Sequence, residues 1–255
     1  MRVLVCVKRV PAPGAKINIT ADGQAVDTAY LAFTTSPHEE CAVEAAVQLV
    51  EAHGGEATVL TLGPGEAEEQ LRYAASVGVA KCVLLPIDTA DWDPQRTAAA
   101  ITAAISAHEA VDGPFDLVLF GNESADSGNF QVGVRVAHAL GRPMVNGVKG
   151  IEIDGGTARA KREADAGVEV YALPLPAVLG VKEGINLPRY PTMKGRLNAK
   201  KVAVDAVAPE AEPGGQRMVT LVQAAEQASQ TVVLGHGPDA APAVVDLLEE
   251  LGILK

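Results

Sequence analysis

Four short apolar runs, each followed by a longer segment with a helical pattern, constrain the fold of this chain most. Val and Leu dominate these runs, which cover residues 2–7, 57–62, 81–86 and 116–120. Near-continuous apolar runs of this length are typical of parallel strands that helices cover on both faces. Because strands and helices alternate along the chain, the sequence predicts an α/β fold with a doubly wound, mostly parallel sheet.

The clearest helix start lies at Ser36. A serine is a good N-cap, Pro37 suits the first helical position, and Glu39 stands where a capping box needs its acid. This helix is predicted to run to about His53, where two glycines end it. Further helices are predicted over residues 66–76, 94–108 and 131–140.

The pattern changes after Met144 to short strands with a turn at residues 154–156. This change predicts an antiparallel segment added to the sheet. Residues 176–181 are predicted to form one more sheet strand, and residues 17–27 a hairpin or an irregular excursion.

The last part of the chain has a different organisation. Residues 202–217 have the Pro and Gly content of an extended linker, and a strand at 231–235 and a helix at 241–251 are predicted after it. We therefore expect two parts: an α/β domain over residues 1–201, and a linker with a C-terminal strand and helix over residues 202–255.

Composition excludes several classes of function. A formal net charge of -11 argues against binding to a phosphate backbone, and an aromatic content of 4% argues against a base-stacking surface, so no nucleic-acid partner is expected. The apolar run at residues 2–7 is too short for a signal peptide, and no run has the length of a membrane span. The 3 cysteines have no metal-like spacing and indicate reduced thiols in a cytoplasmic protein.

The segment Val181–Lys201, here called the arm, is apolar and basic on an acidic protein. Pro188 and Pro191 prevent regular structure along its whole length. Its apolar residues, expected to be exposed, are Ile185, Leu187, Tyr190, Met193 and Leu197. Its cations, which accompany the single acid Glu183, are Lys182, Arg189, Lys194, Arg196, Lys200 and Lys201. An exposed apolar and cationic segment predicts a docking surface.

Four segments at predicted strand ends form a candidate ligand site, because ligands of open α/β sheets bind at the carboxyl ends of strands. These segments are residues 6–8, 36–39, 62–65 and the glycine-rich loop 121–132. Neither GxxxxGK[ST] nor GxGxxG follows any strand, so a P-loop or a standard dinucleotide site is not indicated. No nucleophile elbow is visible, which argues against an enzyme.

Several of these segments together resemble the beta subunit of electron transfer flavoproteins. The similarity runs through VLVCVKRV, SPHEECAVEAAVQL, the LGP turn and the DLVLFG loop, and is sharpest in LPAVLGVKEGINLPRYPTMKGRLNAKK. The resemblance implies an α/β fold of the adenine-nucleotide alpha-hydrolase type. It also implies a non-enzymatic electron carrier that forms a heterodimer with an alpha subunit holding FAD.

The resemblance implies one buried AMP in this subunit. The AMP contacts would come from two groups of residues. The first group is Cys6, Ser36, Pro37, His38, Glu39 and Leu62. The second group is Gly121, Asn122, Glu123, Ser124, Ala125, Asp126, Ser127, Gly128, Asn129, Phe130, Gln131 and Val132.

The resemblance also implies that the arm docks flavin dehydrogenases such as the acyl-CoA dehydrogenases of fatty acid oxidation. Met193 occupies the position of the apolar anchor, and the other implied contacts are Lys182, Ile185, Leu187, Arg189, Tyr190 and Arg196. Electrons would pass from the dehydrogenase to the alpha-subunit FAD and on to a quinone-linked oxidoreductase. Residues 202–255 would pack on the alpha subunit.

The resemblance leaves the nucleotide open. Gln131 and Gly133 fit members that bind AMP, although Phe130 replaces an Asn of those members. The sequence Gln-Val-Gly at residues 131–133 also matches electron-bifurcating members, which hold a second FAD and accept hydride from NADH. Pro13 stands where some members place a tyrosine beside the flavin. A third reading, an adenine-nucleotide hydrolase, has neither a phosphate motif nor an evident general base.

Overall fold

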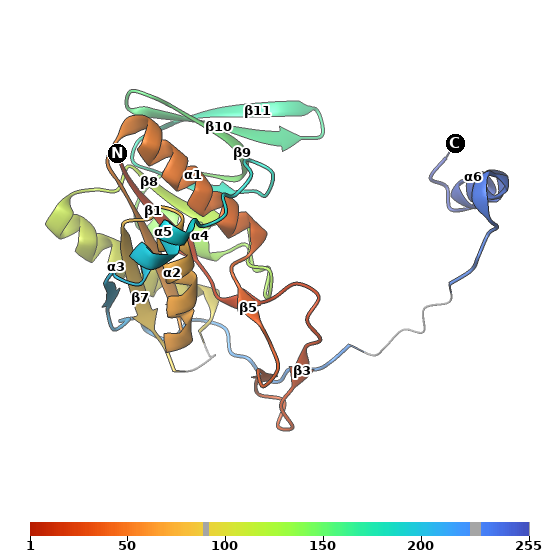
Figure 1. The fold of residues 1–255 in the computed structure, drawn as a ribbon, viewed down its shortest axis with the longest axis horizontal. Helices are drawn as coiled ribbons and strands as arrows, with labels where there is room; N and C mark the ends of the chain where they lie inside the picture. Colours follow the sequence, from red (N-terminus) through yellow and green to blue (C-terminus); the bar gives the residue numbers. More distant parts are fainter. Residues whose placement is uncertain (89–91, 225–230, 255) are drawn as a thin grey trace. The chain divides into compact units, whose positions relative to one another are not determined.

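The computed structural model describes residues 1–88, 92–224 and 231–254. It divides into a compact unit over residues 1–221 and a second unit over residues 222–255. The first unit is built on a nine-stranded sheet with the order β11-β10-β9-β12-β8-β1-β6-β7-β13 (Figure 1).

The parallel part of the sheet is the one that the four apolar runs predict. These runs form β1 (Arg2–Val7), β6 (Glu56–Gly63), β7 (Lys81–Pro86) and β8 (Leu117–Gly121). The strand β12 (Ala177–Val181) pairs in parallel with β8. The predicted α/β fold with a mostly parallel sheet is confirmed.

Antiparallel strands extend one end of the sheet, as predicted. They are β9 (Met144–Asp154), β10 (Thr157–Ala164) and β11 (Gly167–Pro174). At the other end, β13 (Val204–Ala206) pairs in parallel with β7. Part of the segment with the composition of a linker is therefore an edge strand.

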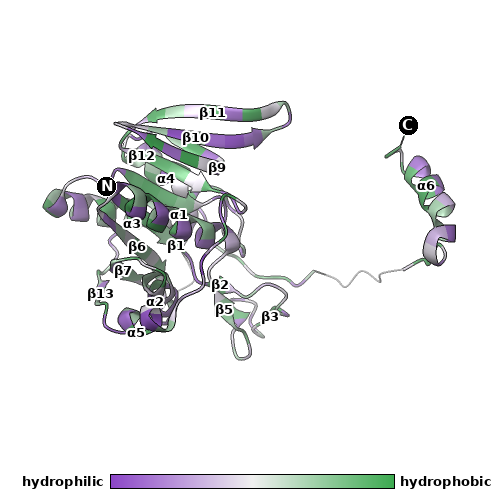
Figure 2. Cartoon of the chain, turned by 45° about the horizontal axis from the view of Figure 1, so that its top comes forward, coloured by the Kyte–Doolittle hydropathy of each residue, from purple (hydrophilic) through white to green (hydrophobic). Residues whose placement is uncertain are grey.

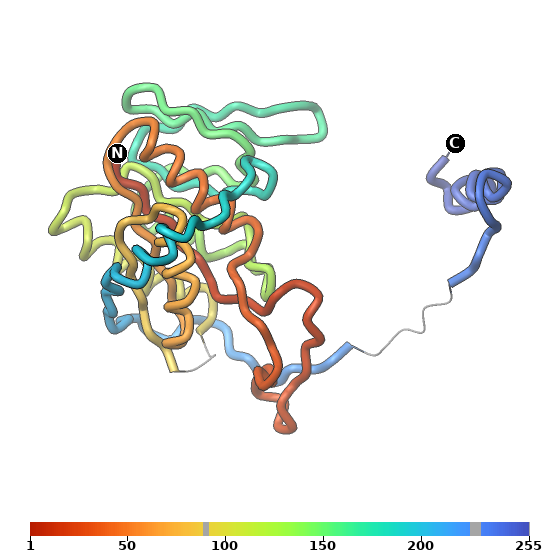
Figure 3. The backbone as a smooth tube through the Cα atoms, in the orientation of Figure 1, coloured from red at the N-terminus to blue at the C-terminus, as the bar shows by residue number. Residues whose placement is uncertain are grey.

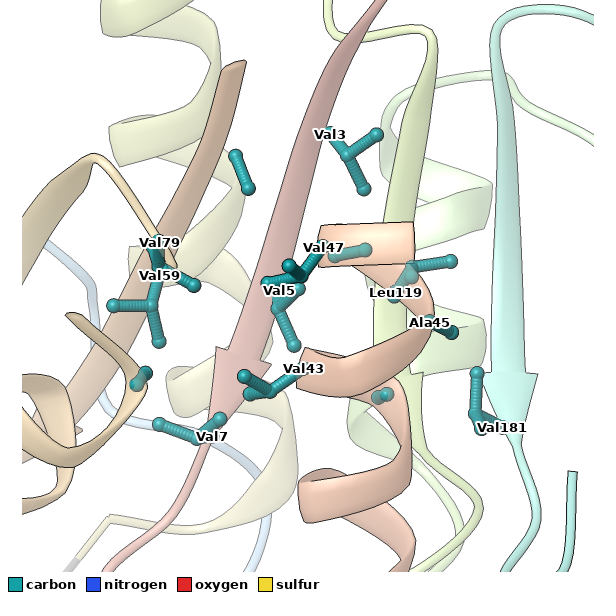
Figure 4. Packing of buried hydrophobic residues seen from close by; sticks show 14 of the residues in the cluster. Val3, Val5, Val7, Val43, Ala45, Val47, Val59, Val79, Leu119 and Val181 are labelled. Carbon is teal, nitrogen blue, oxygen red and sulfur yellow. The ribbon is translucent and has the colours of Figure 1, made fainter. Parts of the chain in front are cut away.

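Helices cover both faces of the sheet. The helices α1 (Pro37–His53) and α2 (Glu68–Ser76) pack on one face, and α3 (Pro94–Asp112) and α4 (Val132–Ala139) pack on the other. Figure 2 shows the apolar strands between these helices. Side chains of β1 alternate between the two cores, so Val3 and Val5 lie with Val47 of α1 on the face seen in Figure 4.

Local signals explain where the helices begin. The backbone N–H of Ser36 donates to Glu39 Oε2 at 3.3 Å, which is the reach-back half of the predicted capping box. The Asp93 carboxylate accepts from the Arg96 N–H at 2.7 Å and caps α3. A 3₁₀ turn, η1 (Gly65–Ala67), precedes α2, so the α-helix begins two residues later than the predicted position 66.

A short excursion follows β1. It contains β2 (Val10–Pro11) paired with β5 (Phe33–Thr34), and the predicted hairpin of β3 (Asn18–Ile19) and β4 (Val26–Asp27). The chain returns to this hairpin near the end of the first unit, where the Leu221 N–H donates to the Gly23 carbonyl at 2.8 Å (Figure 3).

The second unit contains η2 (Gly237–Ala240) and the predicted helix as α6 (Ala241–Glu250). The predicted strand at residues 231–235 is wrong: these residues form no strand, and Val232 and Val233 are exposed. Apolar β-branched residues need a neighbouring strand to form a ladder, and none pairs with them in the described part of the unit. Residues 225–230 and residue 255 are not among the described residues.

Among the described residues, no helix has the length and the apolar character that a membrane span requires.

Candidate functional site

A cavity of about 360 Å³ lies at the carboxyl ends of β1, β6 and β8. From β1 the sheet continues to β6 and β7 on one side and to β8 and β12 on the other, so the strand order reverses here. Such switch points are where open α/β sheets bind ligands. The volume lies near the lower end of small-molecule sites, which span roughly 300–1,000 Å³.

The structure brings most of the predicted ligand residues to this cavity. Those that line it are Cys6, Glu39, Leu62, Gly121, Asn122, Glu123, Ser124, Asp126, Ser127, Asn129, Phe130, Gln131 and Val132. The others lie close by in the chain but outside the lining. Ser36 is the buried N-cap of α1, Pro37 and His38 form its first turn, and Ala125 and Gly128 belong to the loop after β8.

Lys8, at the end of the predicted segment 6–8, also lines the cavity. Further lining residues lie outside the predicted segments: Arg9 follows β1, Thr97 lies on α3, and Met144 and Asn146 lie on β9. Another such residue, Trp92, carries the Arg96 guanidinium at 4.0 Å from its ring centroid. Only the position of Lys8 at a strand end signals a role in the sequence. The others reach the cavity through tertiary packing.

Glu39 is a buried acid in the cavity wall, with only 6% of its surface exposed. Burial raises the pKa of its carboxyl to about 7, although the backbone N–H groups of Lys8 and Ser36 donate to it and oppose the rise. Near neutral pH the Glu39 side chain is therefore a mixture of its carboxylate and carboxylic acid forms. It offers the cavity a hydrogen-bond acceptor above that pH and a donor below it.

Gly121 allows this close packing at the end of β8. A Cβ atom there would lie 2.6 Å from Glu39 Cγ and 3.3 Å from the Glu39 backbone nitrogen. Real Cβ atoms do not come as close as 2.6 Å to another carbon, so any side chain at position 121 would force the Glu39 side chain or the first turn of α1 to shift.

An ion pair closes the loop after β8 onto the end of β1. The Lys8 ammonium lies 2.6 Å from an Asp126 carboxylate oxygen. Burial favours the neutral form of Asp126, but the Lys8 charge and hydrogen bonds from Ser127 and Ser124 outweigh it and hold the pKa below its usual range. Phe130 has a φ of 56°, a left-handed backbone conformation that is unusual for a bulky residue. The Lys8–Asp126 ion pair thus ties this loop to the end of β1.

The thiol in the cavity is not activated. Burial raises the pKa of Cys6, and the nearby Glu39 charge raises it further. A nucleophilic cysteine needs the thiolate, which this environment disfavours. The lining therefore has the character of a binding site, with polar groups around an apolar floor.

The arm leaves β12 beside this cavity. The Asn122 N–H donates to the Val181 carbonyl at 2.8 Å, which joins the loop to the base of the arm. The arm contains one short helix, α5 (Met193–Ala199), whose N-cap hydroxyl on Thr192 accepts from the Gly195 N–H at 3.0 Å.

The predicted docking residues divide into two groups. Leu187, Tyr190 and Met193 are 89%, 91% and 75% exposed, and Lys182 and Arg196 are also exposed. Ile185, which was expected to be exposed, is half-buried against the core instead, and half-buried Arg189 pairs with acids of α1. The arm thus carries both exposed apolar side chains and exposed cations.

Comparison with known proteins decides the family. A model described as "Electron transfer flavoprotein domain" matches residues 25–212. An electron transfer flavoprotein subunit beta from Syntrophomonas wolfei is 39% identical over 210 residues, which are 82% of this chain and 80% of that protein. The chain belongs to the electron transfer flavoprotein beta-subunit family.

Other electron transfer flavoprotein beta subunits extend this relationship. The one from Mycobacterium tuberculosis is 35% identical over 208 residues, covering 79% of this chain and 77% of its own. The mitochondrial one from Oryza sativa is 32% identical over 213 residues, covering 82% and 83%. Membership in the electron transfer flavoprotein family makes the chain a flavoprotein subunit of electron transport.

Proposed function

We propose that this chain is the subunit of a heterodimeric electron transfer flavoprotein that buries AMP and docks flavin dehydrogenases. Electrons then pass from the dehydrogenase to an FAD held mainly by the alpha subunit, and on to a quinone-linked oxidoreductase. The chain itself performs no bond chemistry. It acts in the cytoplasm, and of the predicted second part, residues 202–255, the portion after the first unit packs on the alpha subunit.

The observation that carries the proposal is the cavity at the switch point of the sheet. It gathers the loop after β8, the first turn of α1 and the ends of β1 and β6 around one space. Its volume of about 360 Å³ falls within the range of small-molecule sites. A bound nucleotide joins these segments and stabilises the native state by mass action.

The docking part of the proposal rests on the arm. Large apolar side chains that stand free of a protein's core mark surfaces for other proteins. Acyl-CoA dehydrogenases, the flavin enzymes of fatty acid oxidation, are the partners proposed for it. The arm would hold such an enzyme while the flavin domain moves between partners.

Nucleotide content tests the cavity proposal. The complex of this chain with its alpha subunit is purified and denatured, and the released nucleotides are separated by chromatography. We expect one AMP and one FAD per heterodimer. Two FAD molecules, no AMP and reduction by NADH would instead establish the bifurcating alternative, and turnover of ATP would establish a hydrolase.

A second prediction concerns Met193. Met193→Ala removes an exposed apolar anchor, and truncation of such anchors costs about 1–3 kcal/mol of binding, so kcat/KM for reduction by a dehydrogenase should fall roughly 5- to 150-fold. AMP and FAD content should not change. Val111→Ala is the matched control, because Val111 is also exposed, at 83%, but lies on α3. Equal kinetics for both variants would refute docking through the arm.

A further inference from the structure

The first half of the arm follows helix α1 turn by turn. The Glu183 N–H donates to His38 Nδ1 at 2.8 Å, and the Asn186 amide donates to the Cys41 carbonyl at 3.0 Å. Both pairs of residues are separated by 145 positions in the sequence. In Figure 3 the segment after β12 runs beside α1. The arm is therefore laid along the helix in a fixed register.

Arg189 makes the next contact of the series, again 145 positions from its partner. Its Nε lies 2.9 Å from Glu44 Oε2, and its Nη2 lies 3.0 Å from Glu44 Oε1. Its Nη1 and Nη2 also donate to the two carboxylate oxygens of Glu51 at 2.7 and 2.9 Å. One guanidinium thus forms two paired contacts, the geometry in which arginine binds carboxylates most strongly.

The burial of Glu44 makes this contact specific. Its side chain is only 4% exposed, whereas that of Glu51 is 58% exposed. A buried carboxylate needs a paired cation, and Arg189 supplies it. Glu51 lies two helical turns further along α1, so both acids stand on the face that the arm covers. The pKa of Arg189 is raised by its bonds to Glu51 and Glu44.

The contact also fixes which side chains of the arm face outward. Arg189 turns toward α1, and its sequence neighbour Tyr190 is 91% exposed. Leu187 lies between Asn186 and Arg189, which both bind α1, and it is 89% exposed. A guanidinium engaged by two carboxylates is not free to meet a partner protein.

We propose that Arg189 is a positioning residue, which clamps the arm to Glu44 and Glu51 and so pre-forms the apolar face of Leu187, Tyr190 and Met193. This inference rests on the proposed docking function. A face that is ordered before the encounter spares the complex the entropic cost of ordering the arm. The role differs from a direct contact with the dehydrogenase, which the positive charge of the arm would otherwise suggest.

The experiment uses the heterodimer and two readouts. Amide hydrogen exchange over residues 183–192 reports the order of the arm, and reduction by a flavin dehydrogenase gives KM and kcat separately. Arg189→Gln should accelerate exchange of the arm at least tenfold and raise KM, with kcat at saturating dehydrogenase unchanged. Glu44→Gln should act in the same direction. Because Arg189→Gln already removes the guanidinium contact with Glu44, Glu44→Gln/Arg189→Gln should do no more than Arg189→Gln alone.

Two variants keep the test decisive. The double variant contains no uncompensated buried charge, so it remains folded if Arg189→Gln alone does not. Arg196→Gln removes the same charge from the arm, but its side chain forms no ion pair with any described residue, so exchange of the arm should not change.

The outcomes separate this inference from the docking proposal. Unchanged exchange in Arg189→Gln would overturn the clamp. Faster exchange with an unchanged KM would overturn the positioning role if Met193→Ala does raise KM. If neither variant changes KM, docking through the arm has failed, and the positioning role fails with it, while exchange still reports the clamp.

Discussion

Replacing Glu39 by glutamine is expected to stabilise the protein at pH 8 far more than at pH 5.5. Burial raises the pKa of Glu39 to about 7, above the value of about 4.3 for a glutamate in an unfolded chain. Between these two values the native state binds more protons than the unfolded state, so this group makes stability fall as the pH rises. Above both values the full cost is about 4 kcal/mol.

Glutamine removes this cost because it cannot ionise, yet it keeps an oxygen that accepts the Ser36 N–H. Urea unfolding of both proteins from pH 5.5 to 8 measures the effect, and about 2 kcal/mol of the difference should develop in this range. Glu66→Gln, at an exposed position, is the control and should show no such pH dependence. A difference between the wild type and Glu39→Gln that is constant with pH would show that Glu39 titrates normally.

Gly121→Val is expected to abolish retention of the cavity ligand. The added atoms would occupy space held by Glu39 Cγ, which lies 2.6 Å from the position of a Cβ atom. Overpacking of this kind costs about 1–3 kcal/mol of stability and would push the first turn of α1 out of place. Nucleotide released per heterodimer should fall at least tenfold, as measured by chromatography after denaturation.

Gly156→Val is the matched control for this variant. Gly156 lies in the turn between β9 and β10, and a Cβ atom there would meet nothing within 4 Å. Its nucleotide content should equal that of the wild type. Full retention of nucleotide in Gly121→Val would mean that the ligand lies elsewhere.

The parallel sheet was predictable because its strands are buried on both faces. A strand such as β1, with Val3 to Val7 all buried, must be apolar throughout, and this leaves a clear pattern in the sequence. The edge strand β13 leaves none. The three residues of β13 have only one neighbouring strand, so their composition resembles that of a linker. The run at residues 231–235 has the opposite property, since it is apolar but pairs with no strand within the described ranges.

The candidate site was predictable where it follows strand ends. The loop after β8 and the start of α1 meet because the carboxyl ends of parallel strands share one edge of the sheet. Met144 and Asn146 were not predictable, because they enter the cavity from β9 across the sheet. The orientation of Arg189 depends on Glu44, which lies 145 positions away, and charge alone does not reveal it.

The central place of β1 in the sheet bears on how the chain folds during synthesis. Its two neighbours are β6 and β8, so the first strand made is complete only when residues 117–121 have appeared. The ribosome adds about 5–20 residues per second, which leaves one edge of an apolar strand open for several seconds. Pairings between residues so distant in sequence also form slowly. The newly made chain is therefore most prone to aggregate before β8 emerges, and α1, which can already cover one face of β1, gives it partial protection.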